Sequence, residues 1–269
     1  MLTQEKIGII GLGFVGNAIR QSYADPFVKV ICIDTDPRKA TGETYEDLRD
    51  ASGIFICVPS PPDFEGRCDP TILISVLEKL KGFNGVIISK VTATPDIYEE
   101  LGIQYPNLVH SPEFLTSANA VDDYLDTKFC IIGGSIKAYV HEATRLIKLG
   151  KNNLDVTYHC TIGEASFAKY VINSFLATKV VFMNEMAELA KFSNHDWNMI
   201  RQLIALDGKR IGNSHTRVPG NDGHYGFGGA CFPKDTQALI KYAESKKVSL
   251  NVLTSAVKKN TLLRLTNSK

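Results

Sequence analysis

Short apolar, β-branched runs alternate with helical patterns over the first part of the chain. The runs predict strands at Lys6–Ile10, Val28–Ile33, Gly53–Val58, Gly85–Ser89, Leu108–Ser111 and Phe129–Gly133, with a weaker strand around Asp155–His159. Runs that are apolar on both faces are typical of parallel strands with helices on both sides of the sheet. The alternation therefore predicts an α/β fold, a Rossmann-type doubly wound parallel sheet in an N-terminal domain of residues 1–160.

From about Thr161 the pattern becomes helical throughout, which predicts an all-helical second domain of residues 161–269. The expected elements are a long helix at Ile162–Ser193, a shorter helix from near Asp196, a polar loop at Asn213–Tyr225, and two further helices, one from Pro233 and one at Ser249–Leu265. The apolar face of the long helix is wider than one domain needs, which is typical of a seam between domains or subunits. We therefore expect at least a homodimer.

A glycine motif follows the first predicted strand and opens the first predicted helix. In GLGFVG the first glycine permits a tight turn, the second lets the backbone approach a pyrophosphate, and the third lets the helix pack on the strand. The next strand ends in an acid, which accepts hydrogen bonds from a ribose and repels a 2′-phosphate, so NAD is expected rather than NADP. The predicted cofactor contacts here are Gly11, Gly13, Phe14, Val15, Gly16 and Asp34.

Several loops follow the carboxyl ends of later strands, where α/β sheets bind their ligands. We expect one cleft to be lined by Pro59, Ser60, Lys90, Val91, Ser111, Pro112 and Glu113. Val58, Pro59, Ser60 and Lys90 are assigned to the cofactor. Glu113 lies in an otherwise apolar loop, SPEFL, which favours a role in the site over the alternative of a surface ion pair.

The run Gly226–Asp235, GFGGACFPKD, carries the candidate nucleophile. Because proline is favoured in the first turn of a helix, Cys231 is predicted just before a helix N-terminus. There the helix dipole and Lys234 favour the thiolate, and Asp235 is placed to orient a water. The alternative is a glycine turn with a small buried cysteine.

Composition narrows the class of protein. The 269 residues include 30 basic and 29 acidic side chains, a balance that does not suggest binding to nucleic acid or to a membrane surface. Six cysteines without a CxxC pair and scattered histidines argue for reduced thiols in the cytoplasm and against a metal site. Neither a membrane span nor a signal peptide is predicted.

These motifs together resemble the UDP-glucose/GDP-mannose dehydrogenase family, and most closely its UDP-glucose 6-dehydrogenase branch. The matching segments span nearly the whole chain in the family's order: GLGFVG at Gly11, VPSP at Val58 with Gly66 and Asp69 behind it, SPEFL at Ser111, AKYVINSF around Lys169, RIGN at Arg210, and GFGGACFPKD. The resemblance implies oxidation of the C6 alcohol of a nucleotide sugar, with UDP-glucose expected as the substrate. Two NAD are reduced in turn, through a thiohemiacetal and a thioester on a cysteine.

Site residues follow from the resemblance position by position. It implies Cys231 as the nucleophile, Lys169 and Asn173 as oxyanion stabilisers, and Asp235 or Glu113 as the group that activates water. Lys169 and Asn173 are four residues apart and share one helix face, although such a pair is also ordinary on a surface helix. Lys234 is implied at the cofactor. The implied substrate contacts are Phe114, Leu115, Arg210, Gly228 and Gly229.

The sequence departs from the family pattern in three places. Lys90 stands where a threonine is usual, and Ser117 stands where a second glutamate is frequent. Members of the family usually carry a further C-terminal nucleotide-binding domain, which we expect this chain to lack. These departures leave open how the nucleotide is held and whether hydrolysis is complete.

Two other functions remain open at this stage. One is a two-electron dehydrogenase acting on a hydroxy acid, which does not require a cysteine flanked by glycines. The other is a catalytically silent NAD-binding or assembly protein. The sequence does not distinguish which sugar nucleotide is the substrate or what the order of the oligomer is.

Overall fold

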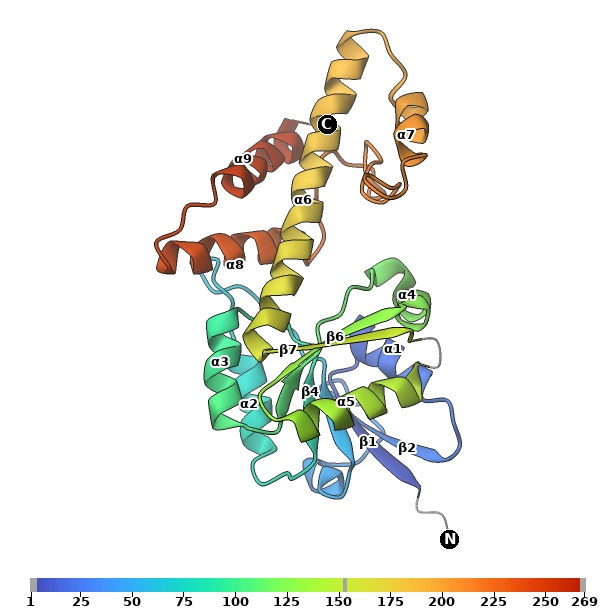
Figure 1. Cartoon of the computed structure of the whole chain (residues 1–269), viewed down its shortest axis with the longest axis vertical. Coiled ribbons are helices and arrows are strands. Elements are labelled where there is room, and N and C mark those ends of the chain that lie inside the picture. Colours follow the sequence, from blue (N-terminus) through green and yellow to red (C-terminus); the bar gives the residue numbers. More distant parts are fainter. Residues whose placement is uncertain (1–3, 152–153, 267–269) are drawn as a thin grey trace. The chain divides into compact units, whose positions relative to one another are not determined.

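The computed structural model describes residues 4–151 and 154–266 and divides the chain into two compact units (Figure 1). Unit 1 comprises Met1–Pro61 and Cys68–Lys169, and unit 2 comprises Pro62–Arg67 and Tyr170–Lys269.

Unit 1 is built on a seven-stranded sheet with the strand order β2-β1-β3-β4-β5-β6-β7. The strands are β1 Glu5–Ile10, β2 Val28–Ile33, β3 Gly53–Ile56, β4 Val86–Ser89, β5 Leu108–His110, β6 Phe129–Gly134 and β7 Val156–Cys160. Each falls on a segment that the apolar pattern predicted. The α/β fold class with a Rossmann-type first part is confirmed.

One junction of the sheet differs from the fully parallel prediction. β5 and β6 are antiparallel, with Val109 opposite Gly134, and β7 then pairs in parallel with β6. The connection from β5 to β6 contains only the short elements η2 (Ser117–Asn119) and α4 (Ala120–Asp126), and α4 packs against α1. It does not return the chain along the sheet as a parallel crossover must. Apolar runs alone do not reveal strand direction.

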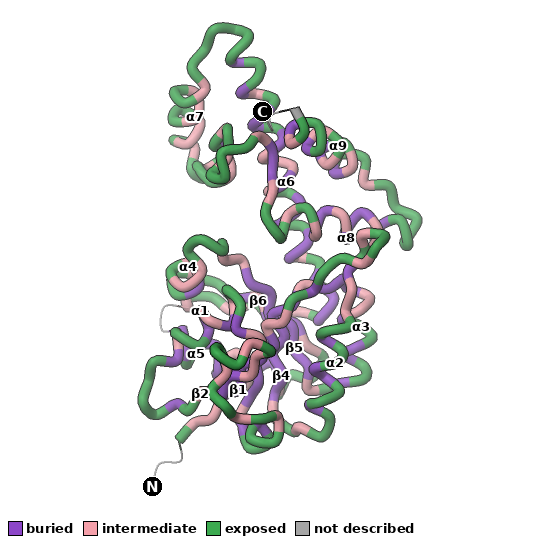
Figure 2. The backbone as a smooth tube through the Cα atoms, turned by 180° about the vertical axis from the view of Figure 1, so that it is seen from behind, coloured by how far each residue is buried: buried purple, intermediate pink, exposed green. Residues whose placement is uncertain are grey.

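Helices cover both faces of this sheet. On one face α1 (Phe14–Ser22), α4 and α5 (Lys137–Gly150) enclose a continuous core that includes Ile7, Ile9, Ile19, Phe55, Tyr124, Ile132 and Leu146. The crossovers through α2 (Thr71–Lys79) and α3 (Pro95–Gln104) run in the opposite direction from β1–α1–β2. Because such crossovers are right-handed, α2 and α3 lie on the other face. Figure 2 shows the strands in the middle of the unit as mostly buried.

The strand order reverses between β1 and β3, and this reversal locates the ligand crevice. Doubly wound sheets bind their ligands at such a switch point, outside the carboxyl ends of the strands. The loops that leave β1, β3, β4 and β5 at this edge contain Gly11, Ser60, Lys90 and Glu113. The short 3-10 helix η1 (Tyr45–Leu48) lies outside this edge, in the connection from β2 to β3.

Unit 2 is helical in the residues that the structure describes. Its helices are α6 Ile162–Phe192 (from Tyr170 onward), α7 Trp197–Ala205, α8 Phe232–Ser245 and α9 Asn251–Thr266. α6 begins with a capping box, in which Thr161 and Glu164 each bond the other's backbone N–H. The unit-2 core joins α6, the glycine motif and α9 through Ala177, Val181, Phe227, Ala256 and Leu263.

Candidate active site

The glycine loop after β1 is shaped by close backbone packing. Gly11 has a φ of +90°, and a Cβ there would lie 2.9 Å from the carbonyl oxygen of Cys57, just after β3. A Cβ on Gly16 would overlap the carbonyl oxygen of Gly11. By contrast, a Cβ on Gly13 would meet nothing within 4 Å. The loop therefore leaves open space at its second glycine, where a pyrophosphate needs to approach the start of α1.

Asp34, at the end of β2, is tied to this loop. Its carboxylate accepts hydrogen bonds from Leu12 N at 2.5 Å and from Asp36 N at 2.8 Å. The neighbouring Phe14 is exposed, whereas Val15 packs against the core. The open glycine and the acid beside it fit a dinucleotide whose ribose is bound by a carboxylate.

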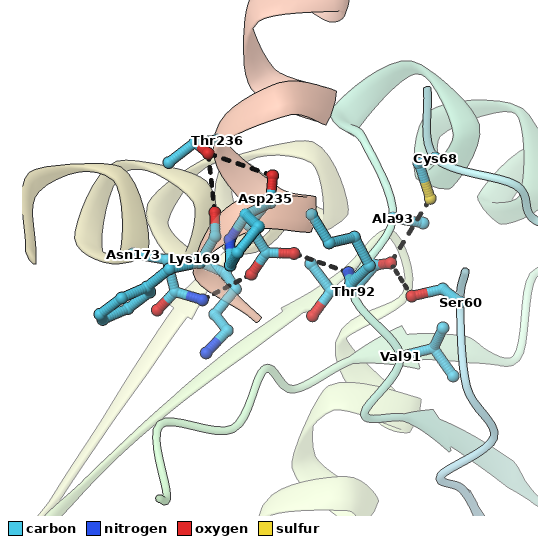
Figure 3. A network of polar contacts seen from close by, with 12 residues as sticks. Ser60, Cys68, Val91, Thr92, Ala93, Lys169, Asn173, Asp235 and Thr236 are labelled. Atoms are coloured by element: carbon cyan, nitrogen blue, oxygen red, sulfur yellow. Dashed lines mark hydrogen bonds and ion pairs between the residues drawn. The ribbon is translucent and has the colours of Figure 1, made fainter. Parts of the chain in front are cut away.

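The loops after β3 and β4 are joined by hydrogen bonds (Figure 3). Ser60 Oγ donates to the carbonyl oxygen of Thr92 at 2.7 Å, and Cys68 Sγ donates to the same oxygen at 3.5 Å. Val58 and Pro59 lead into Ser60, and Pro59 is exposed while Ser60 is buried. These contacts fix the shape of the edge on which Lys90 lies.

Glu113 is buried in unit 1 at the carboxyl end of β5, so the alternative of a surface ion pair is wrong. Its Oε2 lies 3.2 Å from Lys90 Nζ, and the same ammonium donates to Ser111 Oγ at 3.1 Å. Lys169 Nζ donates to the main-chain oxygen of Glu113 at 2.5 Å and lies 4.9 Å from the ring centroid of Phe114. The structure thus brings Lys90, Glu113 and Lys169 together.

Positive charge keeps the Glu113 side chain ionised. Burial alone would raise the pKa of Glu113, but the charges of Lys90 and Lys151 and a hydrogen bond from Phe114 N outweigh it and lower the pKa. Lys151, just after α5, is itself buried, and its ammonium lies 3.6 Å from the ring centroid of Tyr124. Burial lowers the pKa of Lys151 to about 8, against the opposing charge of Glu113.

In unit 2, Cys231 is the N-cap residue of α8, as predicted, and its side chain is exposed. The alternative of a buried cysteine is therefore wrong. Asp235 lies in the first turn of α8 and is buried. One of its carboxylate oxygens accepts from Asn173 Nδ2 at 2.6 Å (Figure 3). The other accepts from Lys234 Nζ, also at 2.6 Å. Asn173, Lys234 and Asp235 thus form one polar group in unit 2.

The glycine motif before Cys231 lies against three side chains of α6 and α9. Gly226 N donates to Asn184 Oδ1 at 3.0 Å, and Asn260 both accepts from Phe227 N at 2.6 Å and donates to Phe227 O at 3.0 Å. Arg264 Nε donates to that same oxygen at 3.0 Å. A side chain on Gly226 would overlap Asn260, and one on Gly228 would overlap Arg264. The glycines thus allow backbone to meet protein side chains, while Gly229 faces open space.

The remaining predicted contacts are Arg210, Phe114 and Leu115. Arg210 is exposed and forms an ion pair with Asp207 at 2.9 Å. Phe114 and Leu115 are half-buried beside Glu113. Sequence reasoning missed the buried polar residues Lys151, Asn184 and Asn260 and the half-buried Arg264. Asn184 had one signal, because it occupies an apolar position of the α6 pattern, whereas Lys151 looked like an ordinary lysine at a helix end. Among residues 4–151 and 154–266, no cluster of side chains could hold a metal ion.

Comparison with known proteins identifies the family. Residues 39–149 match the UDP-glucose/GDP-mannose dehydrogenase family, NAD binding domain, and residues 163–262 match the central domain of the same family. The chain belongs to the UDP-glucose/GDP-mannose dehydrogenase family. The resemblance inferred from the motifs is confirmed, and NAD is the cofactor. The glycine loop and Asp34 precede the matched residues and add to the evidence for NAD.

Relatives of this family member include UDP-glucose 6-dehydrogenases. It is 28% identical to the enzyme of Pseudomonas aeruginosa over 95% of this chain and 65% of that protein. It is 32% identical to the enzyme of Rickettsia prowazekii over 91% of this chain and 57% of that protein. The chain therefore spans less than two thirds of the length of these relatives.

Solved structures agree on the fold. The UDP-glucose dehydrogenase of Pyrobaculum islandicum superposes with a TM-score of 0.81 at 23% identity, over 96% of this chain and 68% of that one. The 3-hydroxyisobutyrate dehydrogenase of Mycobacterium tuberculosis superposes with a TM-score of 0.71 at 14% identity, over 95% of this chain and 92% of that one. Within the described residues of this family member, no helix is both long and apolar enough to cross a membrane.

Gly13→Ala tests the cofactor cradle of this family member. A methyl group at Gly13 meets no protein atom within 4 Å, so we expect the melting temperature to stay within about 2 °C of the wild type, while NAD binding weakens at least about tenfold. Gly208→Ala, which also meets nothing within 4 Å, is the matched control and should leave NAD binding unchanged. Calorimetric titration with NAD measures the affinity of both variants, and thermal denaturation measures their melting temperatures. Equal affinity in Gly13→Ala and the wild type would contradict the assignment.

Asn260→Ala tests the anchoring of the glycine motif. It removes two hydrogen bonds to Phe227 and leaves a buried N–H without its acceptor, a loss of about 1–3 kcal/mol. Amide exchange in a peptide covering Gly226–Cys231 should accelerate by about 5- to 150-fold, measured by mass spectrometry. Asn221→Ala, in the exposed part of the preceding loop, should leave this rate unchanged. Unaltered exchange in Asn260→Ala would show that the anchor lies elsewhere.

Proposed function

We propose that this chain oxidises the C6 alcohol of a UDP-sugar, UDP-glucose, to the carboxylate with NAD. The observation that carries the proposal is the exposed thiol of Cys231 at the N-terminus of α8, behind a glycine motif that holds its backbone against α9. Membership of the family and relatives named UDP-glucose 6-dehydrogenase support the same substrate and product.

The proposed reaction consumes one water and two NAD per sugar. An alcohol, two NAD⁺ and water give a carboxylate, two NADH and three protons, so four electrons leave the carbon. NAD, when bound, supplies the acceptor for each hydride. Gly11, Gly13, Gly16 and Asp34 are the residues that would hold it, with Val58, Pro59 and Ser60 along the next strand end.

Cys231 supplies the covalent step of the proposal. Its thiolate attacks the aldehyde carbon to form a thiohemiacetal, and oxidation of this adduct gives a thioester. Water then adds to the thioester carbonyl, and the C–S bond breaks to release the carboxylic acid and the free thiol. The positive end of the α8 dipole favours the thiolate as both the attacking and the leaving group.

The polar residues described in each unit are assigned roles in the proposed reaction. Lys169 and Asn173 supply donors for the oxyanions that form during attack and hydrolysis. Asp235 and Glu113 are the two carboxylates available to accept a proton from water. Phe114, Leu115, Gly228, Gly229 and Arg210 are proposed substrate contacts. Gly229 is the one of the two glycines with open space beside it.

A homodimer completes the proposal. On α6, Phe175, Phe182 and Leu189 are seven residues apart, lie on one face, and are 65%, 52% and 59% exposed. Large exposed apolar side chains repeated along one face of a helix, here called the stripe, are typical of a protein interface. We place the pairing surface of two chains on this stripe. The six free cysteines agree with a location in the reducing cytoplasm.

Counting NADH tests the reaction. Wild-type protein supplied with UDP-glucose should release two NADH per sugar consumed, and Cys231→Ser should bind NAD with wild-type affinity and form no acid. Cys160→Ser, at a free thiol that is half-buried, is the control and should keep both NADH.

Other ratios distinguish the alternatives. One NADH per substrate with a hydroxy acid, and none with a UDP-sugar, would favour the second candidate, a two-electron hydroxy-acid dehydrogenase. The fold match to 3-hydroxyisobutyrate dehydrogenase over 95% of this chain is the observation in its favour. NAD binding without any reduction would favour a catalytically silent protein.

Phe182→Glu tests the pairing surface. A charge in the middle of the stripe would have to be buried without a partner on association, so we expect a dimer in the wild type and a monomer in the variant. Sedimentation or light scattering at micromolar concentration measures this. Ile103→Glu, at an exposed apolar residue of unit 1, should leave the dimer intact. A wild-type monomer would contradict the proposal.

A further inference from the structure

The Lys90–Glu113 pair is an unusual element of the carboxyl edge of the sheet. Both side chains are buried, at 2% and 5% exposure, so neither charge is screened by bulk water. Removing one partner of such a pair leaves an uncompensated buried charge. The charge of Glu113 is therefore balanced by groups within unit 1 and not by solvent.

We propose that Lys90 is the positioning residue of Glu113, which it holds as a carboxylate in a single orientation. In the oxidation proposed above, and resting on that function, Glu113 then accepts hydrogen bonds or a proton from water and does not act as an acid. Lys90 is thereby assigned to hydrolysis of the thioester, whereas Cys231 carries the covalent intermediates of the oxidation.

Geometry selects Lys90 among the three lysines near Glu113. Lys90 Nζ reaches the carboxylate itself, at 3.2 Å, whereas Lys169 Nζ bonds the main-chain oxygen and Lys151 Nζ lies over the Tyr124 ring. Lys90 is in turn fixed by Ser111, from the adjacent strand end, at 3.1 Å. The second carboxylate oxygen accepts Phe114 N at 3.1 Å. Each oxygen of Glu113 thus has a fixed donor.

Several other titratable groups surround Glu113 in unit 1. They come from every neighbouring element, namely Cys57 after β3, His110 on β5, Tyr124 on α4, Cys130 on β6, Lys151 after α5 and Lys169 on α6. Burial raises the pKa of Cys57 to about 12 and lowers the pKa of His110 to about 3. Burial also raises the pKa of Tyr124, and Lys151 keeps its charge below its pKa of about 8. Cys57, His110, Tyr124 and Lys151 therefore do not titrate between about pH 5 and 7, so they do not mask a change in the protonation of Glu113 in that range.

Lys90→Met keeps the length of the side chain and removes the charge. In the wild type the pKa of Glu113 lies below its ordinary 4.5, so its stabilising effect is present above that pH and is lost as the pH falls through the lowered pKa. Without Lys90, the largest of the charges that oppose burial is lost, so the pKa rises above the wild-type value. Between the two pKa values, the ratio of the variant's unfolding equilibrium constant to that of the wild type should grow by up to about tenfold for each unit by which the pH rises.

Urea denaturation followed by circular dichroism from about pH 4 to 7 measures this ratio. Glu113→Gln/Lys90→Met compared with Glu113→Gln is the control and should show a ratio independent of pH. Ser111→Ala removes a neutral partner of the same ammonium and should also give a ratio that is nearly independent of pH. A constant ratio for Lys90→Met across the range would overturn the proposal, because Lys90 would then contribute packing alone.

Glu113→Gln keeps the proposal testable if Lys90→Met does not fold. The stability of the wild type relative to Glu113→Gln should be constant above about pH 5 and fall below it. A change between about pH 5 and 7 would show that Glu113 titrates near neutrality and would contradict the proposal. Lys90→Arg, which retains the charge, should keep the wild-type pH dependence.

Kinetics separate this proposal from the proposed function. With UDP-glucose and NAD, Lys90→Met should lower kcat by more than about tenfold. Lys90→Arg should recover part of kcat. If wild-type protein reduces no NAD with any nucleotide sugar, the proposed function fails, and the denaturation experiment still decides whether Lys90 controls Glu113. An unchanged kcat in Lys90→Met would refute the catalytic assignment alone.

Discussion

A carboxylate removed from water at the end of β5 requires compensating charge within the protein, and much of unit 1 around the site supplies it. Glu113 is compensated by Lys90 from the end of β4 and by Lys151 after α5, while Lys169 on α6 bonds its main-chain oxygen. An isolated buried charge costs several kcal/mol, so these segments have to meet in one arrangement for unit 1 to be stable. The cost of burying the carboxylate thus defines the carboxyl edge of the sheet.

A different constraint acts in unit 2, where backbone meets side chains at very short range. The main chain of Gly226 and Phe227 is held by amide groups of Asn184 and Asn260, and Gly228 passes beside Arg264. Buried backbone donors and acceptors need such partners, and a strand ladder is not present in the described residues of this unit to provide them. The motif is therefore glycine-rich partly because larger side chains would overlap its neighbours within the protein. Cys231 follows a backbone segment that these hydrogen bonds hold in place.

Features with a local signal could be predicted from the sequence. The strands, the glycine loop with Asp34, the long helix α6 and the position of Cys231 before α8 all depend on residues close together in the chain. The reversal of β6 was not predictable, because apolar runs carry no direction. Lys151, Asn260 and Arg264 gain their roles from partners far away in sequence, so composition and spacing gave no warning. Lys90 was recognised as a departure, and only the fold shows that its ammonium reaches Glu113.

The central claim is that Cys231 carries the substrate as a covalent adduct. Rapid acid quenching of protein with UDP-glucose and NAD, followed by peptide mass spectrometry, tests it most directly. We expect a thioester of the oxidised nucleotide sugar on the peptide that contains Cys231, absent when NAD is omitted and absent in Cys231→Ser. Acid formation with no adduct on that peptide, or with the adduct on another residue, would contradict the account.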